Sequence, residues 1–224
     1  LARAFVATCF LYVRKRSRQL PLPGRFFMSK NKKKESNHMK TTPLFLIVGR
    51  SGTGKDTLAS YLEKFYGLKN ALTYTTRPMR TENEKTHHFV DRHTFHKIKN
   101  KLAVREFKVN DKLEFYCTTL DDLLDADLVI IDTTGAEELY EAVHHFRPVT
   151  LVYVTADRRK RLNALDERGA DPSDVIYRDH IEDELFYKFE TETVPIFHDV
   201  ICTKNNYTGT YPNAVAHEIM KHMF

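Results

Sequence analysis

The chain has 224 residues, 42% of them hydrophobic, which is enough apolar material for one medium-sized domain with a packed core. Its net charge of +5 is unevenly distributed, because residues 1–40 hold eleven basic residues against one acid, whereas the remainder is net acidic. The acidic remainder argues against nucleic-acid binding by the domain. No apolar run reaches the ~20 residues that a membrane-spanning helix needs.

Cysteine usage indicates a reducing environment. Cys9, Cys117 and Cys202 are odd in number, far apart and without CxxC spacing, so they predict neither a disulfide framework nor a structural zinc site. We therefore expect a cytoplasmic protein without membrane contact, either a monomer or a homodimer.

The basic segment 1–40 differs from the rest of the chain. An apolar stretch at Phe5–Val13 precedes two basic runs, Arg14–Arg18 and Lys30–Lys34. This Arg-rich, acid-poor composition leaves three interpretations open: an upstream extension outside the fold, an organelle-targeting segment, or a basic arm that touches nucleic acid or anionic lipid. We exclude the segment from the fold and expect one domain over residues 41–224.

The most informative stretch is Leu44–Leu58, LFLIVGRSGTGKDTL. A short apolar run typical of a buried parallel strand is followed by a Gly-x-x-x-x-Gly-Lys loop. Its glycines allow positive φ and close backbone approach, so successive N–H groups can wrap a polyphosphate while Lys55 reaches the β- and γ-phosphates. The helix that begins next adds its dipole, which favours anions. The predicted ATP-binding residues are Gly49, Arg50, Ser51, Gly52, Thr53, Gly54, Lys55, Asp56 and Thr57.

The residue after the lysine departs from the usual motif. Such loops normally carry Ser or Thr there as a magnesium ligand, whereas this chain has Asp56 and only then Thr57. Either Asp56 reaches the metal through water or Thr57 takes over the polar role, and the sequence leaves both open. We expect Mg²⁺, with ATP as phosphate donor, as the cofactor.

A hydroxyl- and arginine-rich segment follows the first helix. The helix is predicted over Thr57–Phe65, with Gly67 as its stop, and the segment Leu72–Arg80 contains Pro78, which blocks a helix. Two arginines three residues apart after threonines offer forked donors and hydroxyls that suit a phosphate monoester. A solvated surface turn is equally compatible with this composition.

The loop and this second segment together resemble the guanylate kinase family. Gly49–Lys55 is followed about twenty residues later by Thr75-Thr-Arg77-Pro-Met-Arg80, then by an acidic stretch and His88-Phe89-Val90. The similarity extends from about Leu44 to the C-terminus. It implies an α/β fold, a P-loop three-layer αβα architecture with a central parallel sheet, a small β-rich monophosphate-binding region and a helical lid.

By this resemblance, Arg77 and Arg80 hold the phosphate of the acceptor, and we expect Thr73 of the same segment to bind the acceptor as well. The family's next landmarks are a glutamate soon after the second arginine and a tyrosine before a Phe-Val pair. Glu82 or Glu84 corresponds to the glutamate, and His87 stands where the tyrosine would be.

Two β-type segments, Leu102–Phe107 and Leu113–Thr118, flank a polar turn and follow a short helix expected at Phe95–Asn100. In the family, this region covers the monophosphate and reads the base.

Three residues of these segments match family positions. Tyr116 matches a phosphate-binding tyrosine, whereas Glu106 and Thr118 match the groups that recognise guanine. A carboxylate accepts from guanine N1–H and N2–H together, a donor pair that adenine lacks. Without the resemblance, Glu106 is interpreted as an ordinary surface charge.

A second buried strand, Asp127–Ile131, ends in Asp132 and a turn at Gly135, and a helix is expected from Ala136 to His145. A strand-terminal aspartate beside a phosphate loop usually acts on the magnesium shell or the acceptor, since ligands bind at the carboxyl ends of parallel strands. Asp132 and Gly135 also match the family's D-x-x-G. We therefore assign Asp132 to both the acceptor site and the metal.

A third core strand, Val149–Val154, completes the strand–helix alternation of a parallel sheet. It leads into a basic segment in which Arg168 and Arg178 match the family's lid arginines. A basic helix-turn-helix over a phosphate site neutralises the transferring γ-phosphoryl and excludes water. The run Arg158–Arg161 is alternatively a solvated helix face.

The C-terminal part predicts a helix with an aromatic core stripe, then a last strand and a closing amphipathic helix. The stripe consists of Phe186, Tyr187 and Phe189, and the strand of Val200–Thr203. Lys204–Asn206 resembles the family loop near the donor adenine.

The sequence thus predicts a nucleoside monophosphate kinase that transfers the γ-phosphate of ATP to GMP. Positioning and charge neutralisation by Lys55, Arg77, Arg168 and Arg178 supply the catalysis, with Arg80 and Mg²⁺. The aspartate after the lysine also resembles deoxynucleoside monophosphate kinases and ribose 1,5-bisphosphate phosphokinase, which use other acceptors. A non-catalytic guanylate-kinase-like protein-binding module is the alternative of another class.

Overall fold

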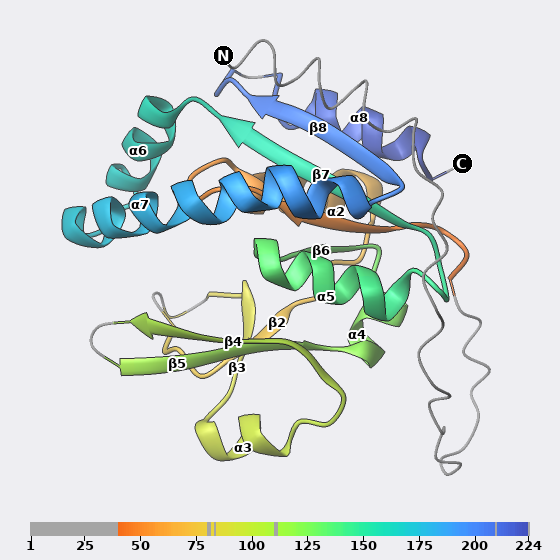
Figure 1. Ribbon diagram of the computed structural model, residues 1–224, viewed down its shortest axis with the longest axis horizontal. Coiled ribbons are helices and arrows are strands. Elements are labelled where there is room, and N and C mark those ends of the chain that lie inside the picture. Colours follow the sequence, from red (N-terminus) through yellow and green to blue (C-terminus); the bar gives the residue numbers. More distant parts are fainter. Residues whose placement is uncertain (1–39, 80–81, 83, 110–111, 209, 224) are drawn as a thin grey trace.

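A parallel sheet of four strands forms the centre of the protein (Figure 1). The structure, a computed structural model, describes residues 40–79, 82, 84–109, 112–208 and 210–223. The strand order is β6-β1-β7-β8, and every neighbouring pair is parallel. The strands are β1 (Leu44–Val48), β6 (Leu128–Ile130), β7 (Val149–Ala156) and β8 (Asp199–Asn205). The predicted α/β class with a central parallel sheet is confirmed.

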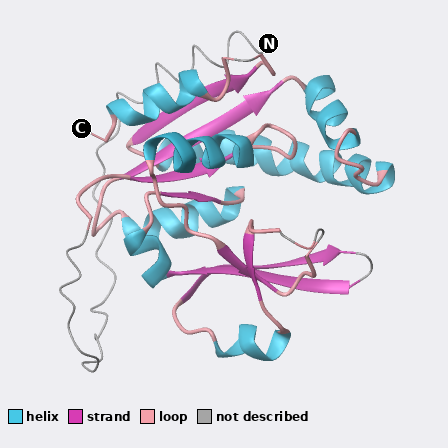
Figure 2. Ribbon diagram, turned by 180° about the vertical axis from the view of Figure 1, so that it is seen from behind, coloured by secondary structure: helices cyan, strands magenta, loops and turns pink. Residues whose placement is uncertain are grey.

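Helices cover both faces of this sheet, which is why β1 and β6 are apolar without interruption. All five residues of β1 are buried; Leu44, Leu46 and Val48 contact one core cluster, and Phe45 and Ile47 contact the other. The first cluster is closed by α5 (Thr133–Val143) and the end of α7 (Pro172–Lys188), and the second by α2 (Lys55–Tyr66) and α8 (Asn213–Lys221). Figure 2 shows this layering from behind.

A second, mixed sheet of four strands lies below the central sheet in Figure 1. Its order is β3-β2-β5-β4, in which β2 and β3 are parallel and the other pairs antiparallel. The strands are β2 (Thr73–Thr75), β3 (His87–Phe89), β4 (Lys101–Val109) and β5 (Lys112–Thr119). This is the β-rich region that the sequence predicts.

Two helices begin earlier than predicted because an aspartate caps each of them. Asp91 accepts a hydrogen bond from the Thr94 amide and begins α3 (Arg92–Lys97), which ends before the predicted Asn100. Asp132 accepts from the Gly135 amide and begins α5. The remaining elements are α4 (Leu120–Asp125), α6 (Arg158–Asp166), a π-helical turn η1 (Phe189–Thr193) and a 3-10 turn η2 (Val194–Ile196).

The predicted aromatic stripe of α7 is wrong in one member. Phe186 and Phe189 are buried against the central sheet, but Tyr187 is 71% exposed. Residue 187 lies one position after Phe186, so on a helix it points about 100° away from it.

No helix in the described part of the chain has the length and apolar character needed to cross a membrane.

A buried arginine fastens the start of β1 to the rest of the sheet. Arg147 is 4% exposed, and its guanidinium donates to the carbonyls of Thr42 (2.6 Å), Pro43 (2.9 Å) and Ala126 (2.7 Å). It also donates to the Leu123 carbonyl at 3.3 Å. These carbonyls come from the segment before β1 and from the end of α4, which one planar group thereby joins.

Arg147→Met is expected to lower the free energy of unfolding by about 3 kcal/mol, because it leaves several buried carbonyl oxygens without a donor. Urea unfolding measures this loss. The matched control is Arg159→Met, since Arg159 is exposed on α6 and its change is expected to cost less than about 0.5 kcal/mol. Equal stability of the two variants would contradict the anchoring role.

Candidate active site

The loop between β1 and α2 has the backbone conformation that its glycines predict. Gly52 and Gly54 have φ of 79° and 91°, in the left-handed region that favours glycine. A Cβ on Gly49 would lie 2.3 Å from the Val154 carbonyl oxygen, so β7 leaves no room for a side chain there. The loop therefore curls tightly over the carboxyl end of β1, beside the end of β7.

The start of α2 presents backbone N–H groups at this curl. The first four N–H groups of a helix have no partner within the helix, and no side chain caps α2 at Gly54. The Lys55 ammonium donates to the carbonyls of Gly49 (2.6 Å) and Arg50 (3.0 Å), so it lies against the loop. Burial lowers the pKa of Lys55, although the charges of Asp56 and Glu182 oppose this shift. These groups form the ready anion site of a helix N-terminus.

Three side chains from the C-terminal part of the chain hydrogen-bond to carbonyls of the loop. Two of them are tyrosines, and no pattern in the sequence predicts their contacts with the loop. Asn205 Nδ2 donates to the Thr53 carbonyl at 3.0 Å, and the Tyr211 hydroxyl donates to the Gly54 carbonyl at 3.1 Å. The Tyr207 hydroxyl donates to the Gly52 carbonyl. Burial raises the pKa of Tyr211, whose hydroxyl is protonated at neutral pH and therefore available as a donor. Because the loop carbonyls are bound from outside, the curl is held in place.

Helix α7 carries carboxylates that contact the same loop. Glu182 accepts from the Ser51 amide at 3.0 and 3.1 Å, and Asp183 pairs with Arg50. Arg161, 2% exposed on α6, donates to the Ser51 carbonyl (2.9 Å) and pairs with Asp179 at 2.6 Å. Among the predicted loop residues, Ser51 thus donates its amide to Glu182 instead of leaving it free. Arg161 joins α6 to the loop through the Ser51 carbonyl.

The lid arginines differ in their placement. Arg168 follows α6 and is exposed; burial lowers the pKa of Lys55, and the positive charge of Arg168 adds to this lowering. Arg178 is exposed on α7. Arg158 is also exposed but pairs with Asp179 at 2.8 Å; Arg161 and Arg158 lower the pKa of Asp179 against the opposing effect of burial. Of the run Arg158–Arg161, only Arg159 and Lys160 make no ion pair among the described residues.

In the β-rich region, Arg77 is held rigidly. It is 3% exposed, and its guanidinium makes two hydrogen bonds to Glu84, at 2.7 and 3.2 Å. It also lies over the Phe89 ring at 5.2 Å, and its amide donates to Thr75 Oγ1. Burial alone would lower the pKa of Arg77, but the Glu84 carboxylate raises it above its usual value. The guanidinium is therefore a fixed cation.

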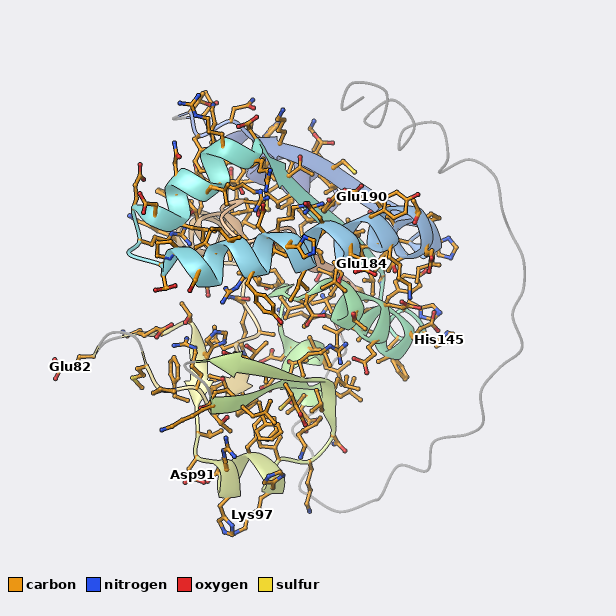
Figure 3. The ribbon with its side chains drawn as sticks, turned by 60° about the vertical axis from the view of Figure 1, so that its left-hand side comes forward. Glu82, Asp91, Lys97, His145, Glu184 and Glu190 are labelled. Carbon is orange, nitrogen blue, oxygen red and sulfur yellow. The ribbon has the colours of Figure 1, made fainter. Side chains whose placement is uncertain are left out.

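Glu82, another predicted acceptor ligand of this segment, lies away from Arg77. Of the two candidate glutamates, Glu84 binds Arg77, whereas Glu82 is exposed and projects away from the small sheet (Figure 3). Arg80 lies outside the described residues.

Thr73, His87 and Tyr116 come together beside Arg77. Thr73 Oγ1 is 2.6 Å from His87 Nδ1, and the ring centroids of His87 and Tyr116 are 5.8 Å apart. The Tyr116 hydroxyl also acts on the pKa of Arg77 through a hydrogen bond. His87 thus lies beside the predicted phosphate ligands, where the resemblance expects a tyrosine.

The register of β4 and β5 separates Glu106 from the other predicted base ligands. Arg105 lies opposite Tyr116, and Glu106 lies opposite Phe115, whose ring packs on Phe95 of α3. Residues directly opposite in a ladder share a face, and neighbours alternate. Glu106 therefore points to the α3 side, and Tyr116 and Thr118 share the other face. The structure does not bring these three side chains together.

Asp132 lies at the end of β6 and pairs with the small sheet. It follows β6, the direct neighbour of β1, so it lies at the same edge of the sheet as the loop. Its Oδ1 accepts from the Gly135 amide at 2.7 Å and lies 3.5 Å from Arg105 Nε. Asp132 thus contacts β4 of the small sheet at the edge of the central sheet where the loop begins.

The residues predicted to bind the metal suit Mg²⁺, which needs few protein ligands because water and substrate phosphates supply the others. Asp56 and Thr57 are exposed on the first turn of α2, and Asp132 is partly exposed nearby. The described residues hold no group of three or more His, Cys, Asp or Glu side chains arranged for a metal. Mg²⁺ usually keeps several waters and takes one or two carboxylates together with substrate phosphates, so the donors present fit it.

The comparisons with known proteins agree with this architecture. Neither a protein-family model nor a curated protein sequence matches the chain. Among solved structures, the chain is similar to guanylate kinase from Anaplasma phagocytophilum, with 19% identity and a TM-score of 0.51. The match covers 83% of this chain and 88% of that one. The chain therefore has a guanylate kinase-like fold.

Gly54→Ala is expected to lower the affinity for Mg·ATP by at least ~10-fold, measured by titration calorimetry. The new Cβ would lie 2.6 Å from Asn205 Nδ2 and would push this brace off the Thr53 carbonyl.

The matched control is Gly67→Ala at the end of α2. Gly67 also has positive φ, at 66°, but no atom lies within 4 Å of the position that the new methyl group would take. Both variants therefore share about 1 kcal/mol of backbone strain, and only one disturbs the loop. Equal loss of nucleotide affinity in both would contradict the bracing role of Asn205.

Proposed function

We propose that the protein is a nucleoside monophosphate kinase that transfers the γ-phosphate of Mg·ATP to GMP, giving GDP and ADP. The observation that carries this proposal is the presence, in one chain, of two groups of residues suited to bind phosphate. One is the curl at the start of α2 with Lys55, and the other is the cluster of Arg77, Tyr116 and Thr73.

The chemistry follows from charge and position. In phosphoryl transfer, negative charge spreads over the equatorial oxygens, and the protein contributes mainly positioning and electrostatic stabilisation. Lys55 and the α2 amides serve the donor phosphates, Arg77 and Tyr116 orient the acceptor phosphate, and Arg168 and Arg178 of the lid close over the transferring group. Both reactants are held by one chain, so no covalent intermediate is needed.

Mg²⁺ supplies neutralisation of the phosphate oxygens when it is bound with ATP. Asp56, Thr57 and Asp132 would hold it through waters or directly. Asp132 also caps α5, and this fixes the carboxylate in the site.

A kinase for another small phosphorylated acceptor is the second candidate. It is favoured by one observation: Glu106, the residue matched to the guanine-reading carboxylate, points to the α3 side of the small sheet. A non-catalytic binding module is disfavoured, because such a module has no need for a braced phosphate loop with its lysine in place.

A coupled assay of ADP release tests the acceptor. GMP is expected to exceed dGMP, AMP, dTMP, dCMP and ribose 1,5-bisphosphate in kcat/KM, by at least ~100-fold over AMP. If another acceptor in this panel were preferred, the GMP assignment would fall while the kinase assignment stayed.

Lys55→Ala is expected to reduce kcat by about 10³-fold, because it removes the cation that faces the β- and γ-phosphates. The matched control is Lys64→Ala, an exposed lysine on the same helix, which is expected to keep wild-type turnover. Thermal unfolding of both variants establishes that they fold. Full activity of folded Lys55→Ala would remove the donor site from this account.

A further inference from the structure

We propose that Arg105, together with Thr118, reads the acceptor base at the O6 and N7 edge of guanine, in the role that the sequence assigns to Glu106. This inference rests on the proposed kinase function and concerns its acceptor specificity.

The strand register carries the first step. Arg105 lies directly opposite Tyr116, so the two side chains share the face that meets α5 and Asp132. Thr118 is two residues beyond Tyr116 on β5 and shares that face too. The ladder shifts by one residue between Leu102 and Arg105, where Ala103 has a φ of 49°, and this bulge sets which β4 residue faces the acceptor side.

The second step is that polar atoms on this face lack partners. Thr118 is fully buried, and its Oγ1 has no hydrogen-bond partner among the described residues. Arg105 Nε is likewise buried without a hydrogen bond, although Asp132 Oδ1 lies 3.5 Å away. Buried polar groups are nearly always hydrogen-bonded, and two of the three exceptions in the described part of the molecule are these atoms. Two buried donors that make no hydrogen bond, on one face of the small sheet, point to a ligand.

The third step is that Arg105 is held in place. Its Nη2 donates to Glu138 at 2.6 Å and its Nη1 to the Val104 carbonyl at 2.7 Å. With Asp132 and Glu138 beside it, the local charge of this group is not positive. A neutral base therefore suits this end of the site better than a second phosphate, which the two carboxylates would repel.

The ligand chemistry follows from the donors. Arg Nε–H donates, and the Thr118 hydroxyl can donate as well. Guanine presents two acceptors, O6 and N7, on one edge, whereas adenine has an amino group at position 6. This edge differs from the N1–H and N2–H edge that a carboxylate reads. Hypoxanthine has O6 and N7 but lacks the 2-amino group, so it separates the two modes.

The experiment compares GMP, IMP and AMP as acceptors for the wild-type protein. With Arg105 reading O6 and N7, kcat/KM for IMP is expected within about 5-fold of GMP, and AMP is expected to be at least ~100-fold poorer. An IMP value 100-fold or more below GMP would overturn the inference, because it would require recognition of the 2-amino group. If none of the three were phosphorylated, the proposed function itself would fail.

Two variants identify the residues. For Arg105→Met, the ratio of kcat/KM for GMP to kcat/KM for AMP is expected to fall at least 10-fold, because the KM for GMP rises. The affinity for ATP is expected to stay unchanged. Thr118→Val keeps the shape of the side chain and removes only the hydroxyl, so it is informative even if Arg105→Met does not fold. The same ratio of kcat/KM values is expected to fall by less, about 3-fold or more. If both variants kept the wild-type ratio, or if Glu106→Gln lost it while Thr118→Val did not, the inference would be wrong.

Discussion

The site depends on the closed curl of backbone between β1 and α2. Its carbonyls are bound from outside by Asn205, Tyr207 and Tyr211, and from within by Lys55. Because each carbonyl has a donor, the loop keeps its shape, and the N-terminal amides of α2 stay directed at the site. A loop of glycines without these braces would lose more entropy on binding a phosphate. The bracing therefore turns a flexible sequence into a preorganised anion site.

Helices α6 and α7 contact the same loop directly. The lid helices reach it through Arg161 and Glu182, which bind the Ser51 carbonyl and amide. Asp132 follows β6, the neighbour of β1, and pairs with Arg105 of the small sheet. A change at the loop is thus felt on the side of α6 and α7 through direct contacts.

The sequence was sufficient where the signal is local. The apolar run of β1, the glycine spacing and the aspartate after β6 predicted the central sheet and the positions of Lys55 and Asp132. It was insufficient where long-range geometry decides: a one-residue bulge before Arg105 fixes which face Glu106 occupies. The alternation of apolar and polar residues along a strand does not reveal such a bulge when no glycine is present. The braces of the loop and the anchor of β1 are also contacts across the fold that spacing does not reveal.

The central claim is that one continuous site holds both nucleotides with their phosphates facing each other. Titration calorimetry with a bisubstrate analogue, adenosine and guanosine joined through five phosphates, tests it most directly. The account predicts one molecule bound per chain in the presence of Mg²⁺, at least ~100-fold more tightly than ATP alone, since the second nucleotide binds intramolecularly. An analogue that bound no more tightly than ATP, or two molecules per chain, would contradict it.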